Sequence, residues 1–203
     1  GGAAAARRVR RLVTVAAAPA QMSSQQPADN VARIPSICQR GASGVAAAEC
    51  RPQMVDVSAK APTVRRARAA CRVMVGAEVA EALAGGKVAK GDVFTVSEVA
   101  GIMAAKRTPD ILPLCHPLPL SRASVQCRLD RAGGVVEVTA DVSCTGPTGV
   151  EMESLTAAAT AALCIYDMCK PITKGIVISD LRLLSKSGGK SGDYDRAADE
   201  SPE

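Results

Sequence analysis

Two charged side chains, Asp167 and Lys170, lie three positions apart near the end of a long apolar stretch of the sequence. On a helix this spacing places both side chains on one face, within reach of each other. A carboxylate beside an ammonium group is either a surface ion pair or a pair that moves protons to and from a substrate. The spacing alone leaves both interpretations open.

Two more acids, Glu151 and Glu153, stand near the other end of the same stretch, residues 148–170. Carboxylates at the start of a helix complement its macrodipole, which is the simpler interpretation. They could also accept hydrogen bonds from the N–H groups of a guanine-like ring. Glu153 and Asp167 would be about 21 Å apart along a helix axis. If both ends act in one site, two copies of the chain must therefore build it.

The only histidine, His116, follows Cys115 in residues 112–120, which contain three prolines. Proline fixes φ and removes a backbone donor, so this segment predicts a rigid extended loop. A lone histidine is more often structural than catalytic, but the rigid loop favours a site here. A nucleophilic Cys115 would need an activating base, and His116 is only its neighbour in sequence, so we disfavour that role.

Six lysines fall in predicted loops or at the ends of predicted elements, and several of them converging on one pocket would form a polyphosphate site. Residues 189–191, Gly-Lys-Ser, look like the end of a P-loop. The glycine that the motif needs five positions earlier is Leu184, and no helix follows, so we reject that reading. A Gly-rich tail that closes over an anion and a solvated tail both stay open. The lysines are Lys60, Lys90, Lys170, Lys174, Lys186 and Lys190.

Alternating or short apolar segments predict four strands, and helical spacing of apolar residues predicts three helices. Arg-Ala-Gly-Gly between the second and third strands indicates a hairpin. In the second helix Val96, Val99, Ile102 and Met103 form the expected apolar side, and Pro109 is expected to stop it. The predicted strands are 65–75, 121–130, 135–144 and 175–184, and the predicted helices are 78–83, 94–106 and 148–170.

The order of these elements predicts an α+β ferredoxin-like sandwich, with an antiparallel sheet and helices on one face. The long helix carries no charge from Ser154 to Tyr166 and shows Leu155, Leu163 and Tyr166 at helical spacing, so we expect it to be buried on most sides. We expect the other face of the sheet to be apolar and covered by a second copy, which makes the protein an oligomer. The Gly/Ser-rich segment 185–195 is predicted to be a mobile tail.

The positive charge is concentrated before Met54, where seven arginines and two acidic residues account for the whole net charge of +5. Residues 1–28 contain four arginines, many alanines and no acid, which is typical of an organellar transit peptide. A disordered basic arm and a nucleic-acid-binding tail are the alternatives. We therefore divide the chain into an N-terminal arm with linker, residues 1–53, and a folded domain, residues 54–203.

Composition also excludes several classes of protein. Three aromatic residues, Phe94, Tyr166 and Tyr194, are too few for a nucleic-acid module that stacks bases. Eight cysteines without a CxxC pair, together with one histidine, argue against a zinc site and for free thiols in a reducing compartment. No apolar run reaches the roughly 18 residues of a membrane-spanning helix.

Seven segments, taken together and in this order, resemble the cyclic pyranopterin monophosphate synthase family of molybdenum cofactor biosynthesis. The match is nearly continuous from Met54 to Asp193. The segments are MVDVSAK (54–60), KGDVF (90–94), AGIMAAKRT (100–108), LPLCHPL (112–118), TGVEMESLTA (148–157), IYDMCK (165–170) and KSGGKSGD (186–193).

The resemblance implies a lyase that converts (8S)-3′,8-cyclo-7,8-dihydroguanosine 5′-triphosphate to cyclic pyranopterin monophosphate and releases diphosphate. It also implies the ferredoxin-like fold and a hexamer, a trimer of dimers, with active sites at the dimer interface. It implies no cofactor and no protein-bound metal, with Mg²⁺ left open as an aid. The N-terminal arm lies outside the resemblance and suggests a mitochondrial matrix protein.

On the matching positions, the resemblance implies that Asp167 and Lys170 are the acid/base pair. Lys90 would be a further proton-transfer or phosphate residue. Pro147 departs from the family pattern, because many relatives carry lysine there; if that lysine binds phosphate, affinity would be lower in this chain. The expected substrate contacts are Cys115, His116, Glu151, Met152 and Glu153, and the expected phosphate ligands are Lys60 and Lys186.

Two functions from other classes compete with the enzyme. A catalytically silent nucleotide-binding or regulatory module on the same fold would bind the cyclised nucleotide without releasing diphosphate. An RNA-binding ferredoxin-like domain would need aromatic residues on its central strands. The predicted strands 121–130 and 135–144 contain none, which argues against RNA binding.

Overall fold

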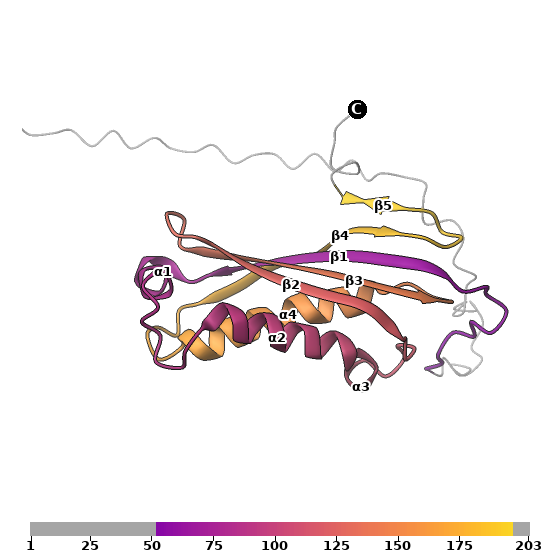
Figure 1. Cartoon of the computed structure of the whole chain (residues 1–203), viewed down its shortest axis with the longest axis horizontal. Helices are drawn as coiled ribbons and strands as arrows, with labels where there is room; N and C mark the ends of the chain where they lie inside the picture. Colours follow the sequence, from indigo (N-terminus) through magenta and orange to yellow (C-terminus); the bar gives the residue numbers. More distant parts are fainter. Residues whose placement is uncertain (1–51, 197–203) are drawn as a thin grey trace, which may run out of the picture. The chain divides into compact units, whose positions relative to one another are not determined.

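The computed structural model describes residues 52–196 and builds them into a five-stranded sheet with helices (Figure 1). The predicted arm, residues 1–53, lies outside the described residues except for its last two positions. The elements are β1 (Thr63–Met74), α1 (Gly76–Ala84), α2 (Val93–Lys106), α3 (Thr108–Ile111), β2 (Leu120–Asp130), β3 (Val135–Gly146), α4 (Glu151–Cys169), β4 (Val177–Ser187) and β5 (Tyr194–Asp195).

The strands lie in the order β2-β3-β1-β4-β5, and every neighbouring pair is antiparallel. The predicted hairpin is present, with Asp130 opposite Val135. The carbonyl of Gly134 in its turn accepts hydrogen bonds from Val75 and Gly76 at 2.9 and 3.0 Å, which fixes α1 to this end of the sheet. Helices α2 and α4 lie on the same face of the sheet (Figure 1), so the predicted α+β ferredoxin-like fold is confirmed.

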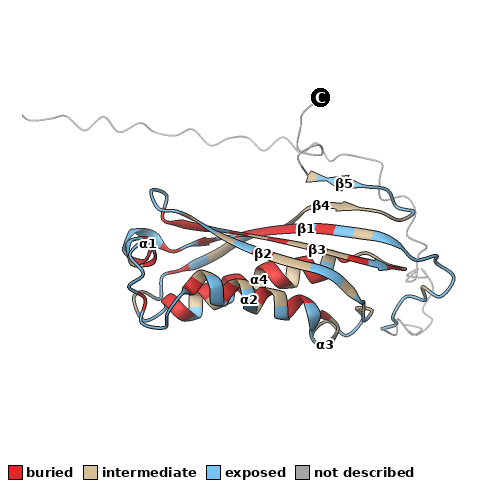
Figure 2. Ribbon diagram, in the orientation of Figure 1, coloured by how far each residue is buried: buried red, intermediate tan, exposed pale blue. Residues whose placement is uncertain are grey.

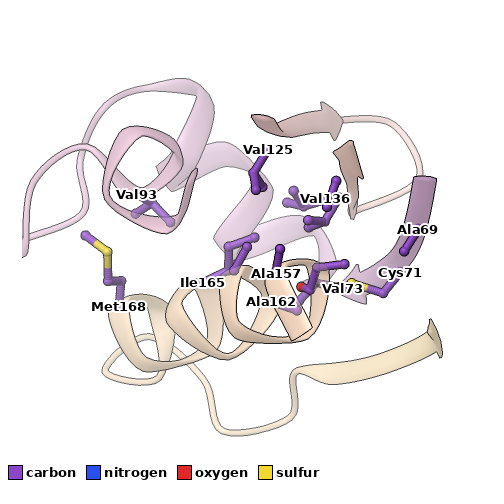
Figure 3. Close-up of a cluster of buried hydrophobic side chains, with 14 of the residues drawn as sticks. Ala69, Cys71, Val73, Val93, Val125, Val136, Ala157, Ala162, Ile165 and Met168 are labelled. Carbon is purple, nitrogen blue, oxygen red and sulfur yellow. Dashed lines mark hydrogen bonds between the residues drawn. The ribbon is translucent and has the colours of Figure 1, made fainter. Parts of the chain in front are cut away.

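The core lies between the sheet and α4, and small side chains dominate the helical side of it. Strand β1 buries Ala67, Cys71 and Val73 in the predicted alternation, and β3 does the same with Val136 and Val138. Figure 3 shows Cys71 and Val73 of β1 beside Ala157 and Ala162 of α4. The buried alanines of α4 are Ala157, Ala158, Ala161 and Ala162.

The predicted apolar faces of the two long helices are confirmed only in part. Ile102 of α2, and Leu155 and Tyr166 of α4, are half-buried and pack against the core. Val96, Val99 and Met103 of α2 are exposed, and Leu163 of α4 is 60% exposed. The helices bury their small residues because small side chains allow close approach of helix to helix and helix to sheet. The larger apolar residues are therefore left on the outer side, where Figure 2 shows the helices mostly exposed or half-buried.

The face of the sheet opposite the helices is polar, so the expectation of an apolar face is also wrong. Arg66 and Arg68 of β1, Arg122 of β2 and Asp141 of β3 line a hollow of about 770 Å³ there. Arg68 and Asp141 form an ion pair at 3.4 Å. Alternation along each strand sends apolar residues to the helices and charged residues to this face. The argument for an oligomer that rested on an apolar sheet therefore fails.

Several boundaries differ from the prediction. Helix α2 does end at Lys106, but Pro109 lies inside the short α3, because proline is tolerated in the first turn of a helix. Helix α4 has 19 residues and begins at Glu151, three positions later than predicted. The predicted tail contributes to the sheet, with β4 extending to Ser187 and β5 pairing on it. No helix within residues 52–196 has the length and apolar character needed to cross a membrane.

Candidate active site

Three charged side chains meet where α4 ends. Lys170 Nζ lies 2.7 Å from Asp167 Oδ1, and Lys90 Nζ lies 2.6 Å from Asp167 Oδ2. Lys90 also donates to the Asp167 backbone carbonyl at 3.0 Å. The predicted pair of Asp167 and Lys170 is thus present, and Lys90 joins it from 77 positions away in the sequence.

Local structure explains how Lys90 reaches this place. It lies in the loop between α1 and α2, two residues before Asp92, the N-cap of α2. The Asp92 carboxylate accepts hydrogen bonds from the backbone N–H groups of Phe94 and Thr95 at 3.1 and 3.2 Å. Such a cap fixes the point at which the chain enters the helix. The loop that carries Lys90 is therefore anchored on its C-terminal side.

Asp167 and Lys170 favour each other's charged forms. Hydrogen bonds from Lys170 and then Lys90 lower the pKa of Asp167 to about 2. The same contact with Asp167 raises the pKa of Lys170. At neutral pH the site accordingly presents a carboxylate between two ammonium groups. The ammonium groups can donate protons and the carboxylate can orient them.

The opposite end of α4 carries a buried acid. Glu153 is 2% exposed, and no hydrogen-bond partner for its Oε2 exists in the described part of the chain. Its Oε1 lies 4.0 Å from Cys115 Sγ. Burial, with a smaller contribution from Glu151, raises the pKa of Glu153. Glu153 was expected at the rim of the helix, but in the first turn of α4 it points into the protein.

The proline-rich loop brings Cys115 and His116 to this end of α4. His116 Nε2 lies 2.8 Å from the Val55 carbonyl, which joins the loop to the segment before β1. A carbonyl only accepts, so Nε2 carries the proton in this contact. Burial, followed by the charge of Glu153, raises the pKa of the Cys115 thiol. A thiol that resists ionisation is a poor nucleophile, which agrees with the role disfavoured from the sequence.

A pocket of about 510 Å³ lies at the same end of α4, where Glu151 lines it, and most of its charged lining residues are cations. Lys186 Nζ lies 3.7 Å from Glu151 Oε1 and donates to Ser191 Oγ at 2.9 Å. Glu151 is the only acid among the residues that line it. Four positive side chains against one carboxylate form a site suited to a phosphate-bearing ligand. The four are Lys60, Arg65, Lys186 and Lys190.

The predicted residues therefore form two clusters, one at each end of α4. Lys90, Asp167 and Lys170 make up the first. The second contains the pocket and the buried acid, and Met152 lies beside it with 41% of its surface exposed. Because Glu153 and Asp167 are on one continuous helix, they are about 21 Å apart. The described chain does not bring the clusters together. The second cluster includes Lys60, Cys115, His116, Glu151, Glu153 and Lys186.

Arg65 is the pocket residue that sequence reasoning missed. Side chains two apart on a strand share a face, and Arg65 is in register with Ala67, which faces the helices. Arg66 and Arg68 belong to the opposite, open face. The sequence could have indicated this residue, because Arg65 is an arginine at a position where the alternation of β1 predicts a side chain that faces the helices.

No group of three or more His, Cys, Asp or Glu side chains is arranged to hold a metal ion anywhere in residues 52–196. The six cysteines in that range are free thiols, as predicted.

Comparison with known proteins gives one consistent result. Residues 54–189 match the model of the MoaC family. A cyclic pyranopterin monophosphate synthase of Desulfitobacterium hafniense is 53% identical over 148 residues, which cover 73% of this chain and 90% of that protein. Proteins of the same name from Streptomyces griseus and Deinococcus radiodurans are 54% and 52% identical. The first alignment covers 74% of this chain and 84% of the relative, and the second covers 75% and 89%.

Proposed function

The chain belongs to the MoaC family, and on that premise we propose that it forms cyclic pyranopterin monophosphate in molybdenum cofactor biosynthesis. The proposed substrate is (8S)-3′,8-cyclo-7,8-dihydroguanosine 5′-triphosphate, and diphosphate is released. The reaction opens and recloses a ring and closes a cyclic phosphate. It needs protons moved on and off nitrogen and positive charge on the departing phosphate oxygens.

The contact of Lys90 and Lys170 with Asp167 is the observation that carries this proposal. Surface ion pairs are usually formed by two groups, but here one carboxylate holds two ammonium groups at 2.6 and 2.7 Å. The two ammonium groups are the proton donors we assign. Asp167 holds them in place and stabilises positive charge that develops beside it.

The cationic pocket supports the second half of the reaction. We assign Lys60 and Lys186 to the phosphates, and Lys190 lines the same pocket. Pro147 supplies no charge but lines the pocket with its neighbour Thr148, so the pocket keeps four cations without a lysine at 147. Met152, Glu153 and the loop of Cys115 and His116 would contact the ring of the substrate.

A complete site would need both clusters, which are about 21 Å apart on α4. We propose that the site joins Asp167, Lys90 and Lys170 of one subunit to the pocket of another. A dimer with two such sites satisfies this requirement. Three such dimers would form a hexamer. Large apolar side chains left exposed on the helices, including Val99 and Leu163, supply surface for subunit contacts.

Two further assignments complete the proposal. The arginine-rich, acid-free composition of residues 1–28 supports a transit peptide and a place in the mitochondrial matrix. The reaction moves protons and phosphoryl oxygens and no net electrons, so it requires no redox cofactor. Mg²⁺ bound to the substrate phosphates would add to the charge that the lysines supply.

The decisive experiment supplies purified protein with the cyclised nucleotide and measures both the pterin product and diphosphate. Asp167→Asn keeps the size of the side chain but removes its charge, so we expect kcat to fall at least about 100-fold. Glu81→Gln is the matched control, because Glu81 is an exposed carboxylate that pairs with Arg131, a residue of neither cluster. Glu81→Gln should keep the activity of the unsubstituted protein.

Binding without diphosphate release by the unsubstituted protein would favour the silent nucleotide-binding module. Activity of Asp167→Asn close to that of Glu81→Gln would instead refute the assignment of Asp167.

A further inference from the structure

The Arg65 guanidinium donates hydrogen bonds to three backbone carbonyls from two separate segments. Its Nε donates to Gly146 at 3.4 Å, its Nη2 to Pro147 at 3.2 Å and its Nη1 to Gly188 at 3.0 Å. Gly146 and Pro147 lead into α4, whereas Gly188 begins the Gly-rich segment after β4. Both segments line the pocket, through residues 147–149 and 189–191. Arg65 thus links two walls of one pocket.

All three acceptors are neutral, so the charge of Arg65 is not cancelled by its partners. Within residues 52–196, Arg65 forms no ion pair with a carboxylate, although Glu151 lines the same pocket. Reaching three carbonyls at once requires the planar fork of a guanidinium, whose donors point in fixed directions. A lysine at this position would keep the positive charge but could not hold both segments in the same way.

The Gly-rich segment is shaped to lie against Arg65. Gly188 and Gly189 have φ of +91° and +89°, a region that side chains other than glycine rarely adopt. A Cβ on Gly188 would overlap the Val64 carbonyl oxygen, and a Cβ on Gly189 would overlap Arg65 Nη1. Asp193 accepts a hydrogen bond from the Gly188 backbone N–H at 3.0 Å. The segment therefore approaches Arg65 more closely than any larger residue would allow.

We propose that Arg65 is a positioning residue that clasps residues 188–191 to the start of α4 and so fixes the backbone of the phosphate pocket. Lys190 and Ser191, the polar members of that segment, are held over the pocket by this clasp. The clasp also accounts for glycine at 189, because that position passes over the guanidinium, whereas Gly188 passes over the neighbouring Val64 carbonyl. The part of the proposal that concerns phosphate rests on the proposed function, but the clasp itself does not.

Two variants separate the shape of the guanidinium from its charge. Arg65→Lys removes the planar fork but keeps the positive charge, whereas Arg65→Met removes both. The first readout is amide hydrogen exchange of residues 188–192, with the amides of β1 and β3 as a check on the fold. Both variants should lower protection of the Gly-rich segment at least about tenfold, because both lose the clasp.

The second readout is the Kd for inorganic diphosphate, which should rise about tenfold or more in Arg65→Lys although the charge is kept. In turnover, Arg65→Lys should raise KM more than it lowers kcat.

Glycine substitutions test the same contact without changing Arg65. Gly189→Ala should loosen the segment and weaken diphosphate binding. Gly192→Ala is its matched control, since Gly192 also has a positive φ, +74°, but a Cβ there would meet nothing within 4 Å. Gly192→Ala introduces the same kind of backbone strain as Gly189→Ala but no clash with Arg65. Its Kd for diphosphate should therefore stay within about twofold of that of the unsubstituted protein. This pair decides the matter if the Arg65 variants do not fold.

Unchanged exchange of residues 188–192 in Arg65→Lys would overturn the clasp, as would equal effects of Gly189→Ala and Gly192→Ala. Full diphosphate affinity in Arg65→Lys would show that Arg65 contributes charge alone. If the unsubstituted protein does not bind diphosphate, the phosphate assignment of the pocket fails, while the exchange data still decide the clasp.

Discussion

At the scale of single residues, α4 carries two acids in opposite electrostatic surroundings. Asp167 is exposed and held by two ammonium groups, and its pKa falls to about 2. Glu153 is buried beside the Cys115 thiol, and burial raises its pKa. Two carboxyl groups whose pKa values are pushed apart can take different roles in one reaction. Asp167 stays ionised down to low pH, whereas burial makes Glu153 take up its proton at higher pH than an ordinary carboxyl group does.

The buried acid leads to a prediction about stability and pH. The raised pKa means that the folded state keeps the Glu153 proton at pH values where the unfolded chain, with an ordinary pKa of 4.5, has lost it. This group therefore lowers the free energy of unfolding as pH rises above 4.5, by at most about 1.4 kcal/mol per pH unit. Glu153→Gln removes the effect. Its free energy of unfolding should rise relative to that of the unsubstituted protein between pH 4.5 and 7, in urea titrations at one protein concentration.

Glu81→Gln provides the control with the opposite sign. Its contact with Arg131 lowers the pKa of Glu81, so Glu81 contributes stability above its ordinary pKa of 4.5 that is lost as pH falls below it. A constant difference in unfolding free energy between the unsubstituted protein and Glu153→Gln at all pH values would contradict a raised pKa for Glu153.

The sequence predicted some of these residues and not others for a physical reason. Asp167 and Lys170 are three positions apart, and helix geometry alone brings them together. The contact of Lys90 with Asp167 depends on how a loop 77 positions away folds, so spacing could not predict it. The three acceptors of Arg65 are Gly146 at the end of β3, Pro147 directly after it, and Gly188 directly after β4. No local pattern in the sequence shows that these positions converge.

At the scale of elements, close packing of α2 on α4 explains why several residues of the predicted apolar helix faces are exposed. An added Cβ at Gly101 of α2 would lie 2.8 Å from the Ala157 carbonyl oxygen of α4 and 3.0 Å from Val125 Cγ2. Such a crossing admits only the smallest side chains. Ranking helix positions by hydrophobicity points to Val99 and Met103, which the structure leaves exposed. Strands were easier to predict, because their two faces alternate strictly.

We predict that Gly101→Ala destabilises the protein although alanine is the better helix former. Overpacking costs about 1–3 kcal/mol, which exceeds the gain of about 0.5–1 kcal/mol from replacing glycine in a helix. The free energy of unfolding should therefore fall. Gly175→Ala serves as the control, because the nearest atom to a Cβ there is Thr173 Oγ1 at an ordinary 3.5 Å. A Gly101→Ala variant more stable than the unsubstituted protein in urea unfolding would show that the helices can separate without cost.

At the scale of the whole molecule, each chain carries two clusters of charged side chains, one at each end of one helix. Helix α4 is continuous from Glu151 to Cys169, so bending of the chain cannot bring its ends to one small ligand. The polar open face of the sheet gives no hydrophobic reason for assembly, contrary to the expectation from the sequence. The case for an oligomer therefore rests on the separation of the two clusters and on the apolar residues left outside the helices.

A mixing experiment tests whether subunits share sites. Asp167→Ala removes one half-site and His116→Ala damages the other, so each variant alone should be inactive. In a twofold-symmetric dimer of the two variants, one site receives both intact halves and the other receives both damaged halves. Equal amounts mixed at random make half of the dimers mixed, so activity should recover to about a quarter of that of the unsubstituted protein. Subunits are exchanged by unfolding and refolding together, and mixed oligomers are verified by two different affinity tags. Recovery requires that the intact Asp167 of one chain serve the intact His116 of the other, and a site contained within one chain would give none.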